Sequence, residues 1–351
     1  MVGPHLRCHL PCKIGTLTAR RFTVAAFDIQ NHILMSNHAS KERPAVSVVI
    51  ISDYGSGQEH TWNVIRRTFA ALAGQDFREP AEFLFVEPSQ SAPLVPSDLA
   101  TILPGFRVVA ADASTSYELK NAAMRAACAD LVVMLDADCA PEPDWLSQLM
   151  RTARAHPEAT VVSGRTTHEG SGLLNRTMAA ANRAYVDVGE TGPTHHISNN
   201  NALFRREAYL AHPLPTDVGP FASHMQVQAI LRDGGTLFFE PRARVEHAYE
   251  GWSTELNFRR EFGYGMIRTR CADPRLPYAW AVRLGYLAIP FFIAHHVLIG
   301  WWRCIRFRSV HRVGWYELPI SFALIAIAGG METSGMISAM RGQPGVESLF
   351  R

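Results

Sequence analysis

The feature that most constrains this chain is a series of short aliphatic runs, each followed by a segment with helical periodicity. Two of these runs, VSVVIIS at 46–52 and LVVML at 131–135, contain no charged residue. Such runs are typical of strands that are buried on both faces, as in a parallel sheet. The helix expected over 58–72 carries its apolar residues on one stripe. This alternation predicts an α/β fold with a mixed, mostly parallel sheet flanked by helices.

The same alternation continues along the first two thirds of the chain. Further strands are expected at 83–87, 106–110, 160–163, 201–204 and 236–240. Further helices are expected at 116–129, 143–155, 205–211, 224–233 and 254–263. Ligands of parallel sheets bind at the carboxyl ends of the strands. Functional residues are therefore expected just after the apolar runs, where Ser52, Glu87 and Asp136 lie.

Asp136 and Asp138 directly follow the strand expected at 131–135, in the sequence LVVMLDADC. Two carboxylates spaced i, i+2 after a buried strand can converge on one ligand, and their mutual repulsion favours a divalent cation between them. Oxygen ligands of this kind suit Mg²⁺ or Mn²⁺ rather than zinc. The alternative interpretation is a solvated turn that ends the strand.

Several motifs in this order and spacing resemble the family 2 glycosyltransferases, which are GT-A-fold enzymes that use nucleotide-diphospho-sugars. In chain order the motifs are VSVVIIS, FLFVE, KNAAMRAACADLVVMLDADCAPEPDWL, SGR, NNNALFRREAYL, GPF, FFEPRARVEH and RREFGYG. The resemblance covers residues 45–270 and implies a GT-A fold. With the apolar C-terminal segments described below, it is closest to the membrane-associated bacterial type.

The resemblance also implies a set of site residues. The nucleotide-sugar site would comprise Ser52, Glu87, Lys120, Asn121, Asp136, Asn200 and Arg205. Glu87 would contact the base, commonly uracil, which favours a UDP-sugar donor. Asp136, Asp138 and His247 would form a site for Mn²⁺ or Mg²⁺. Each residue also has a plain structural interpretation, such as a hydrogen-bonded structural histidine at His247.

One residue that the family pattern requires is missing. Inverting members carry a Glu-Asp pair at the start of a helix, and this Asp deprotonates the acceptor hydroxyl. Counting back from Gly235 places the pair on Ser223 and His224. His224 is one candidate base, because an imidazole pKa of about 6.5 suits proton abstraction near neutral pH. Asp217 in the preceding loop is another. The third possibility is that the site transfers no sugar, or has an anionic acceptor that needs no base.

The composition changes after Pro277. Residues 284–302 carry no formally charged side chain, and 318–331 form a second apolar run. If 284–302 crossed a membrane outward, the arginine-rich segment 303–312 would lie outside, against the positive-inside tendency. An interfacial arrangement avoids this conflict. We expect association with the cytoplasmic face of a membrane, either spanning or interfacial, and the alternative is a buried core helix.

Composition divides the chain into three segments. These are a poorly ordered leader at 1–44 (or an artefact of start-site choice), the glycosyltransferase domain at 45–270 and C-terminal membrane-associated helices at 271–351. A formal net charge of +2 gives no basic field for nucleic acid. None of the six cysteines forms a CxxC pair, which indicates reduced thiols in the cytoplasm.

Together these observations predict a metal-dependent, inverting glycosyltransferase. The acceptor expected from the apolar C-terminal segments is a lipid-linked or envelope saccharide. The alternative from another functional class is a non-catalytic GT-A-like protein that binds a nucleotide-sugar or a partner, which the missing carboxylate would explain.

Overall fold

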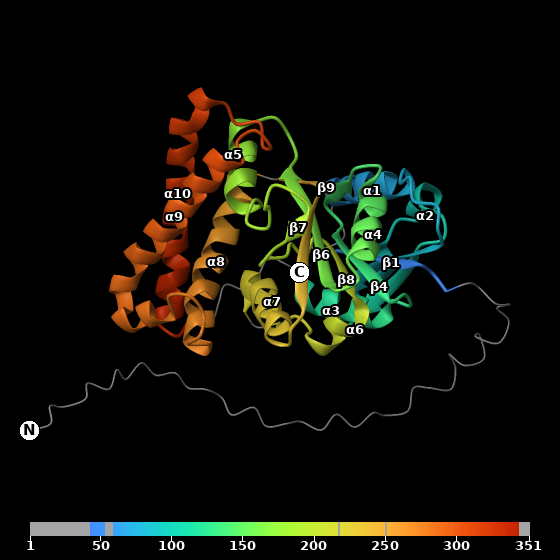
Figure 1. Ribbon diagram of the computed structural model, residues 1–351, viewed down its shortest axis with the longest axis horizontal. Helices are drawn as coiled ribbons and strands as arrows, with labels where there is room; N and C mark the ends of the chain where they lie inside the picture. Colours follow the sequence, from blue (N-terminus) through green and yellow to red (C-terminus); the bar gives the residue numbers. More distant parts are fainter. Residues whose placement is uncertain (1–42, 53–58, 217, 250, 344–351) are drawn as a thin grey trace, which may run out of the picture. The chain divides into compact units, whose positions relative to one another are not determined.

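A computed structural model shows how the apolar runs assemble (Figure 1). It describes residues 43–52, 59–216, 218–249 and 251–343, except for the side chains of 59–61, 253 and 254. The leader expected at 1–44 and the candidate base Asp217 therefore lie almost entirely outside the described residues. All of the elements described below belong to one unit, residues 44–351.

The described strands form one mixed sheet. Its parallel half consists of β1 (Val46–Ile51), β2 (Ala81–Pro88), β3 (Arg107–Ala111) and β4 (Leu131–Asp136), in spatial order β3-β2-β1-β4. The sheet continues through β8 (Asn201–Arg205), β6 (Ala159–His168), β9 (Thr236–His247) and β5 (Cys139–Pro141), and β7 (Gly192–Pro193) pairs with β9. β8 is antiparallel to both neighbours, whereas β6 and β9 are parallel. The predicted mixed, mostly parallel sheet is confirmed.

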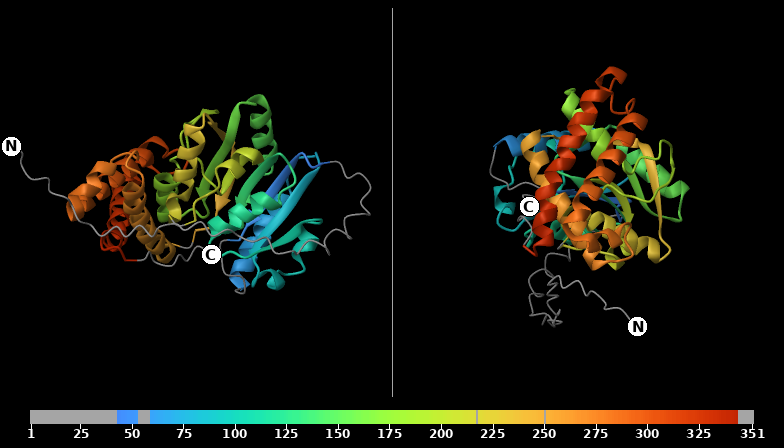
Figure 2. Two further views of the ribbon diagram at one scale, coloured as in Figure 1. Left: turned by 90° about the horizontal axis from the view of Figure 1, so that it is seen from below. Right: turned by 90° about the vertical axis from the view of Figure 1, so that its left-hand side faces the viewer.

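Helices cover both faces of this sheet (Figures 1 and 2). One face packs against α1 (Glu59–Ala73), α2 (Leu99–Ile102) and α4 (Trp145–Ala155). The other packs against α3 (Ser116–Ala126), α6 (Arg206–Ala211) and α7 (Ala222–Arg232). Successive β1 residues, such as Ile50 and Ile51, point into opposite core layers, and both are fully buried. Each such side chain contributes about 1.5–3 kcal/mol, which is why the run has no polar face.

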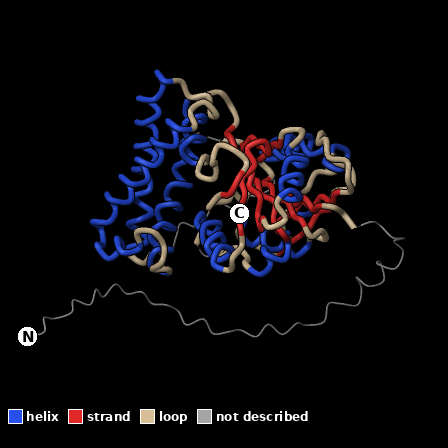
Figure 3. The backbone as a smooth tube through the Cα atoms, in the orientation of Figure 1, coloured by secondary structure: helices blue, strands red, loops and turns tan. Residues whose placement is uncertain are grey.

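A second group of helices lies beside the sheet (Figure 3). It contains α5 (Leu173–Asn182), α8 (Trp252–Ala272), α9 (Ala288–Arg306) and α10 (Leu318–Met340). Short 3₁₀ segments complete the chain: η1 (Ala92–Leu94), η2 (Gly219–Phe221), η3 (Ala279–Leu287) and η4 (Trp315–Glu317). Two described stretches, Ala279–Arg306 and Trp315–Met340, are long and apolar enough to cross a membrane.

Helices α8 and α10 pack with their backbones in contact. A Cβ atom at Gly335 would overlap the carbonyl oxygen of Arg260, and one at Gly263 would overlap that of Glu332. Across the same interface, Arg259 of α8 donates to Glu332 of α10 at 2.8 Å, and both side chains are almost completely buried. His296 of α9 lies 2.7 Å from the same carboxylate. Glycine therefore permits the close approach, and a buried ion pair fixes its register.

The predicted elements differ from the observed ones mainly in length. The strands expected at 160–163 and 236–240 are the first parts of β6 and β9, which continue to the edge of the sheet. The helix expected at 254–263 is the first half of α8. β5 and α5 were not predicted, because three residues and an alanine-rich segment give weak periodic signals.

Candidate functional site

The carboxyl ends of β1, β2 and β4 meet at one edge of the sheet. Ile51, the last residue of β1, pairs with Val86 of β2 on one side and with Asp136 of β4 on the other. The residues that follow these three are therefore neighbours. Four buried polar side chains lie there, and we call this group the acidic edge: Ser52, Glu87, Asp136 and Asp138.

The remaining strands bring further residues to the same edge. β8 begins there, because Asn201 is opposite Leu135 near the end of β4. The end of β9 reaches it as well, because His247 pairs with Cys139 of β5 and with His168 of β6. The long second part of β9, which no sequence pattern revealed, is thus what carries His247 to the acidic edge.

Asp136 is held by Lys120 of α3. The Lys120 Nζ atom lies 2.8 Å from Asp136 Oδ1, and each side chain is less than a tenth exposed. Thr115 and Glu118 form a capping box that fixes the start of the helix carrying Lys120. Burial raises the pKa of Asp136, the Lys120 charge opposes this rise, and the nearby Asp138 carboxylate adds to it.

Asp138 and His247 form a candidate metal centre. Asp138 Oδ2 and His247 Nε2 are 3.2 Å apart, and the Nδ1–H of His247 donates to the carbonyl oxygen of Ala248. Burial lowers the pKa of His247 to about 3, so the ring is neutral and Nε2 carries a lone pair. Two electron-donating atoms therefore face each other, an arrangement that a divalent cation would satisfy. A carboxylate oxygen and an imidazole nitrogen suit Mn²⁺.

Cys139 completes this cluster geometrically but not chemically. Its Sγ atom lies within 4.8 Å of the ligand atoms of Asp138 and His247. Burial raises the pKa of the Cys139 thiol well above its ordinary value, and the neighbouring aspartates add to the effect. A thiol that keeps its proton is a poor ligand for a hard cation. Of the three residues expected to hold metal, Asp138 and His247 are in direct contact with each other. Asp136 lies beside them and forms an ion pair with Lys120.

Sequence analysis missed two residues beside the metal centre, Arg183 and His168. Arg183 Nε donates to His168 Nε2 at 3.1 Å, and the His168 ring stacks on Tyr249 at 4.7 Å between centroids. After burial, the Arg183 charge is the next cause of the low pKa of His247. A guanidinium at this place suits a diphosphate group. Arg183 follows α5, the helix that periodicity did not reveal, so no signal marked it.

The three consecutive asparagines have different tasks. Asn201 is structural, because Trp145 donates to its side-chain oxygen and its amide bonds the carbonyl oxygens of Arg165 and Ala243. Asn200 is buried and contacts Cys139 Sγ at 3.5 Å, so it lines the candidate metal centre. Turn chemistry alone would not distinguish these roles.

Asn199 connects the acidic edge to His224. Its side-chain amide donates to Ser223 Oγ at 2.8 Å, in the first turn of α7. His224 is the next residue and is partly buried, with its ring 6.3 Å from that of His196. Burial lowers the pKa of His224, and the charges of Arg270 and Arg232 act in the same direction. His224 is therefore a neutral imidazole at neutral pH, able to accept a proton.

Two predicted residues do not present their side chains to this edge. Both polar atoms of the Asn121 amide are used by Tyr209 and by the backbone of Leu214. Arg205 pairs with Leu131 at the opposite end of β4 from Asp136, and it bonds the carbonyl oxygens of 157 and 159. Both have structural roles in this arrangement.

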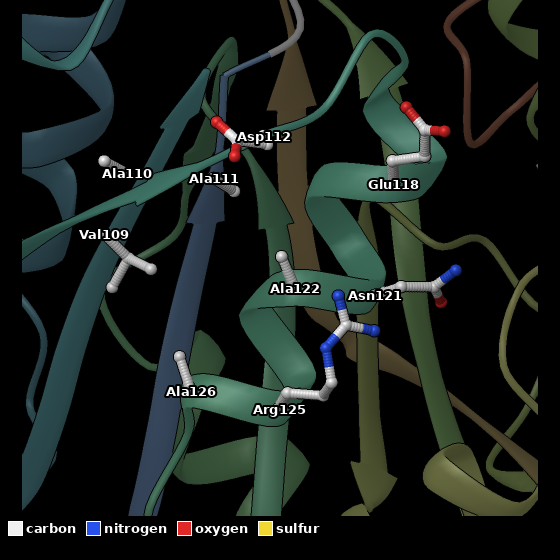
Figure 4. A pocket seen from close by; sticks show the side chains of 9 residues that line it. All are labelled: Val109, Ala110, Ala111, Asp112, Glu118, Asn121, Ala122, Arg125 and Ala126. Atoms are coloured by element: carbon white, nitrogen blue, oxygen red, sulfur yellow. The ribbon is translucent and has the colours of Figure 1, made fainter. Parts of the chain in front are cut away.

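An open pocket of about 710 Å³ lies between the edge strand β3 and α3 (Figure 4). Its lining residues are Val109, Ala110, Ala111, Asp112, Glu118, Asn121, Ala122, Arg125 and Ala126. None of the candidate metal ligands is among them. We therefore centre the candidate site on the acidic edge, where the buried carboxylates and histidines converge, rather than on this pocket.

Comparison with known proteins independently supports a functional site at the acidic edge. The model of the glycosyl transferase family 2 matches residues 47–211, from β1 to α6, which include both aspartates. Residues 47–211 form a family 2 glycosyltransferase domain. His224 and α8 to α10 lie beyond the matched residues. None of the curated proteins matches the chain.

A solved structure shows the same fold. The chain is similar to the mannosyltransferase PcManGT from Pyrobaculum calidifontis, solved in complex with GDP-Man and Mn²⁺. The TM-score is 0.52 at 16% sequence identity, over 85% of this chain and 87% of that one. At this identity the likeness demonstrates the fold, which is GT-A as the sequence predicted.

Proposed function

We propose that the chain is a metal-dependent, inverting glycosyltransferase that moves a sugar from a nucleotide-diphospho-sugar to an acceptor at a membrane surface. The observation that carries this proposal is the contact of Asp138 with His247, at an edge that also gathers Asp136, Lys120 and Arg183. The family match supports sugar transfer. The Mn²⁺ in the similar mannosyltransferase supports a divalent metal.

The donor would lie along the acidic edge. Ser52 follows β1 and Glu87 lies near the end of β2, and both would contact the nucleoside, whereas Asn200 would face the sugar. Lys120 and Arg183 would attract the diphosphate, since both place positive charge beside the aspartates. Glu87 favours a uracil base on the family pattern, whereas the similar mannosyltransferase binds GDP-Man. Both nucleotides are therefore tested below.

Asp138 and His247 would hold Mn²⁺ or Mg²⁺, with Asp136 beside them. When bound, the ion neutralises charge that develops on the leaving diphosphate. The chain contributes the orientation of its ligands: the Ala248 carbonyl sets the tautomer of His247, and Lys120 holds Asp136.

His224 would act on the acceptor. As an acceptor hydroxyl attacks the anomeric carbon, the new C–O bond forms while the bond to the diphosphate breaks and the diphosphate leaves with the electron pair. The hydroxyl proton passes to the neutral imidazole of His224, the residue after Ser223, which Asn199 contacts. Asp217 in the preceding loop is the second candidate for this role.

The helices beside the sheet would attach the protein to a membrane. Their exposed aromatic and aliphatic side chains include Trp280, Tyr286, Leu287, Leu298, Trp302, Trp315, Tyr316, Ile320 and Ile327. The guanidinium of Arg308 lies 4.0 Å from the Trp315 ring centroid, and that of Arg306 lies 5.7 Å from Trp302. Arginine and tryptophan together suit an anionic headgroup layer. Because α10 packs along the charged helix α8, we favour an interfacial arrangement on the cytoplasmic side.

Release of nucleoside diphosphate tests this function. The full chain is incubated with UDP- and GDP-sugars, Mn²⁺ and a membrane lipid fraction. One donor should be consumed by the wild-type protein and by Asp76→Asn, a control at an exposed aspartate beyond α1. Consumption should fall at least about 100-fold in Asp138→Asn, because a metal ligand loses its charge. Equal turnover by Asp138→Asn would contradict the proposal. Nucleotide binding without turnover of any donor would favour a non-catalytic protein.

A further inference from the structure

A group of positively charged and histidine side chains lies between the acidic edge and the helices beside the sheet. It consists of His196, His224, Arg270 and Arg303, which we call the basic cluster. His196 and His224 have their ring centroids 6.3 Å apart. Arg270 lies over Phe221, the residue before α7, at 6.0 Å from the ring centroid. The neighbouring charges that shift the pKa values of His196 and His224 come, among the described residues, from arginines and histidines alone.

In the part of the chain that the structure describes, neither arginine of the basic cluster has a carboxylate partner. Among the described residues, Arg303 makes one hydrogen bond, to the carbonyl oxygen of Ala181 at 3.2 Å, and no ion pair. Within the described ranges, the hydrogen bonds of the Arg270 guanidinium go only to the carbonyl oxygens of Pro277 and Met266. By contrast, Arg259 a few turns away has two buried glutamates. Partly buried guanidinium groups without an anion are costly, so the basic cluster is suited to an anion that arrives from outside.

The basic cluster is joined to the candidate metal centre through two short segments. Arg303 bonds the end of α5, two residues before Arg183. His224 follows Ser223, which Asn199 contacts beside the acidic edge. The cluster therefore lies next to the site where the donor diphosphate would bind, on the side of the helices.

Apolar side chains continue from the basic cluster to the molecular surface. The ring centroid of His295, a residue of α9, lies 4.6 Å from that of Tyr278. The ring centroid of Trp280 lies 5.8 Å from that of Phe291. Trp280 is 59% exposed and Leu287 is 76% exposed. A positively charged site that borders an exposed apolar surface fits a phosphate attached to a hydrocarbon chain.

We propose that the basic cluster, with Arg303 as its main anchor, binds the phosphate of a lipid-linked acceptor. The hydrocarbon chain lies against Tyr278, Trp280 and Leu287, and the acceptor hydroxyl is thereby directed to His224. This inference rests on the proposed function, since it names the acceptor class of the same site. It also explains why positive charge surrounds the position where the family pattern has a carboxylate.

Binding of farnesyl phosphate and of farnesol to the full chain tests this inference without requiring turnover. Wild-type protein and Arg78→Gln, a control at an exposed arginine beyond α1, should bind farnesyl phosphate at least about tenfold more tightly than farnesol. Arg303→Gln should abolish that preference. Arg303→Lys, which retains the charge and the alkyl stem, should bind several-fold more weakly than wild type, because the planar fork is lost.

Three results would overturn the inference. The first is equal binding of farnesyl phosphate and farnesol by wild type, and the second is wild-type affinity for farnesyl phosphate in both Arg303 variants. The third is that phosphatidic acid vesicles compete for the site as effectively as farnesyl phosphate does, which would indicate a general lipid headgroup site. Nucleotide with Mn²⁺ is added separately as a thermal stabiliser of every variant. If nucleotide with Mn²⁺ fails to stabilise wild type, the donor site is contradicted. If nucleotide stabilises wild type but wild type does not prefer farnesyl phosphate, only the role of the basic cluster is contradicted.

Discussion

At the scale of single residues, the site depends on buried polar groups that are held by one specific neighbour each. Asp136 is fixed by Lys120, and His247 is oriented by the carbonyl oxygen of Ala248. Ser223, the residue before His224, accepts a hydrogen bond from Asn199. Each neighbour limits the rotamers of a chemically active group, so substitutions at these neighbours are expected to alter activity without removing that group.

Replacement of His224 by alanine tests the base directly. If His224 accepts the acceptor proton, His224→Ala should lower kcat by about 10²–10⁴ and leave nucleotide affinity unchanged. Its pKa is lowered by burial, so the active, neutral form persists below pH 6.5. The wild-type kcat should therefore fall only in acid, through a pKa below 6.5, and this acid limb should be absent in the variant. Wild-type kcat in His224→Ala would transfer the role to Asp217 or to an acceptor that needs no base.

At the scale of secondary-structure elements, the contact of α8 with α10 decides how the apolar helices are used. The two helices share a backbone contact at Gly335 and a buried ion pair between Arg259 and Glu332. α8 carries several further arginines along its length. A helix that is fixed to such a partner is part of the folded protein, which agrees with an interfacial rather than an isolated spanning role.

Two glycine substitutions on α10 test this contact. Gly335→Ala places a Cβ against the Arg260 carbonyl oxygen and should lower the free energy of unfolding by about 1–3 kcal/mol. Gly330→Ala meets no atom within 4 Å and should be neutral or raise it by up to about 1 kcal/mol through helix propensity. Denaturant unfolding in matched detergent compares the two. Similar stability of both variants would show that α8 and α10 do not pack in this way.

Sequence patterns were sufficient for the central strands of the sheet, but not for β5, for the second part of β9 or for the whole site. Buried runs marked β1 and β4, and therefore the positions of Ser52, Asp136 and Asp138, because strands buried on both faces have a distinctive composition. Arg183 and His168 were not found, since Arg183 directly follows α5 and His168 ends the extended part of β6, and neither segment carries a periodic signal.

The roles of predicted side chains were harder to infer than their presence. Asn121 and Arg205 match the family motifs, yet their polar atoms are used by backbone groups. Hydrogen bonds of this kind join residues that are distant in the sequence, so spacing along the chain does not reveal them. Spacing along the chain does not reveal the role of Asn201 either. Its amide passes so close to Gly164 that a Cβ atom at position 164 would overlap it.

At the scale of the whole molecule, the exposed aromatic and arginine side chains predict electrostatic membrane binding. Arg306→Gln combined with Arg308→Gln should weaken binding to vesicles containing phosphatidylserine by about 2 kcal/mol, roughly 30-fold, since each basic residue near an anionic surface contributes about 1 kcal/mol. Arg78→Gln, at an exposed arginine beyond α1, serves as the control. Vesicle sedimentation measures the difference. Equal binding of the double variant, or no binding by wild type, would contradict membrane attachment through this surface.

The arrangement of the sheet and the apolar helices also determines how donor and acceptor would meet. The donor would lie on the acidic edge of the sheet, and the acceptor would enter from the helices through the basic cluster. These two regions are connected by α5 and by the segment from His196 to Asn199. On this proposal a membrane-bound acceptor would reach the donor without leaving the lipid surface, and the apolar helices would guide the acceptor as well as attach the protein.

The central claim is that Asp138 helps to hold a divalent metal with a nucleotide-sugar donor, and thermal unfolding tests it most directly. UDP, GDP and their sugars are each added with and without Mn²⁺ to wild type and to Asp138→Ala. One nucleotide, at about 100 times its Kd, should stabilise wild type by about 2.7 kcal/mol only when Mn²⁺ is present, and Asp138→Ala should lose this effect. The absence of stabilisation by any nucleotide, or equal stabilisation of the variant, would contradict the account.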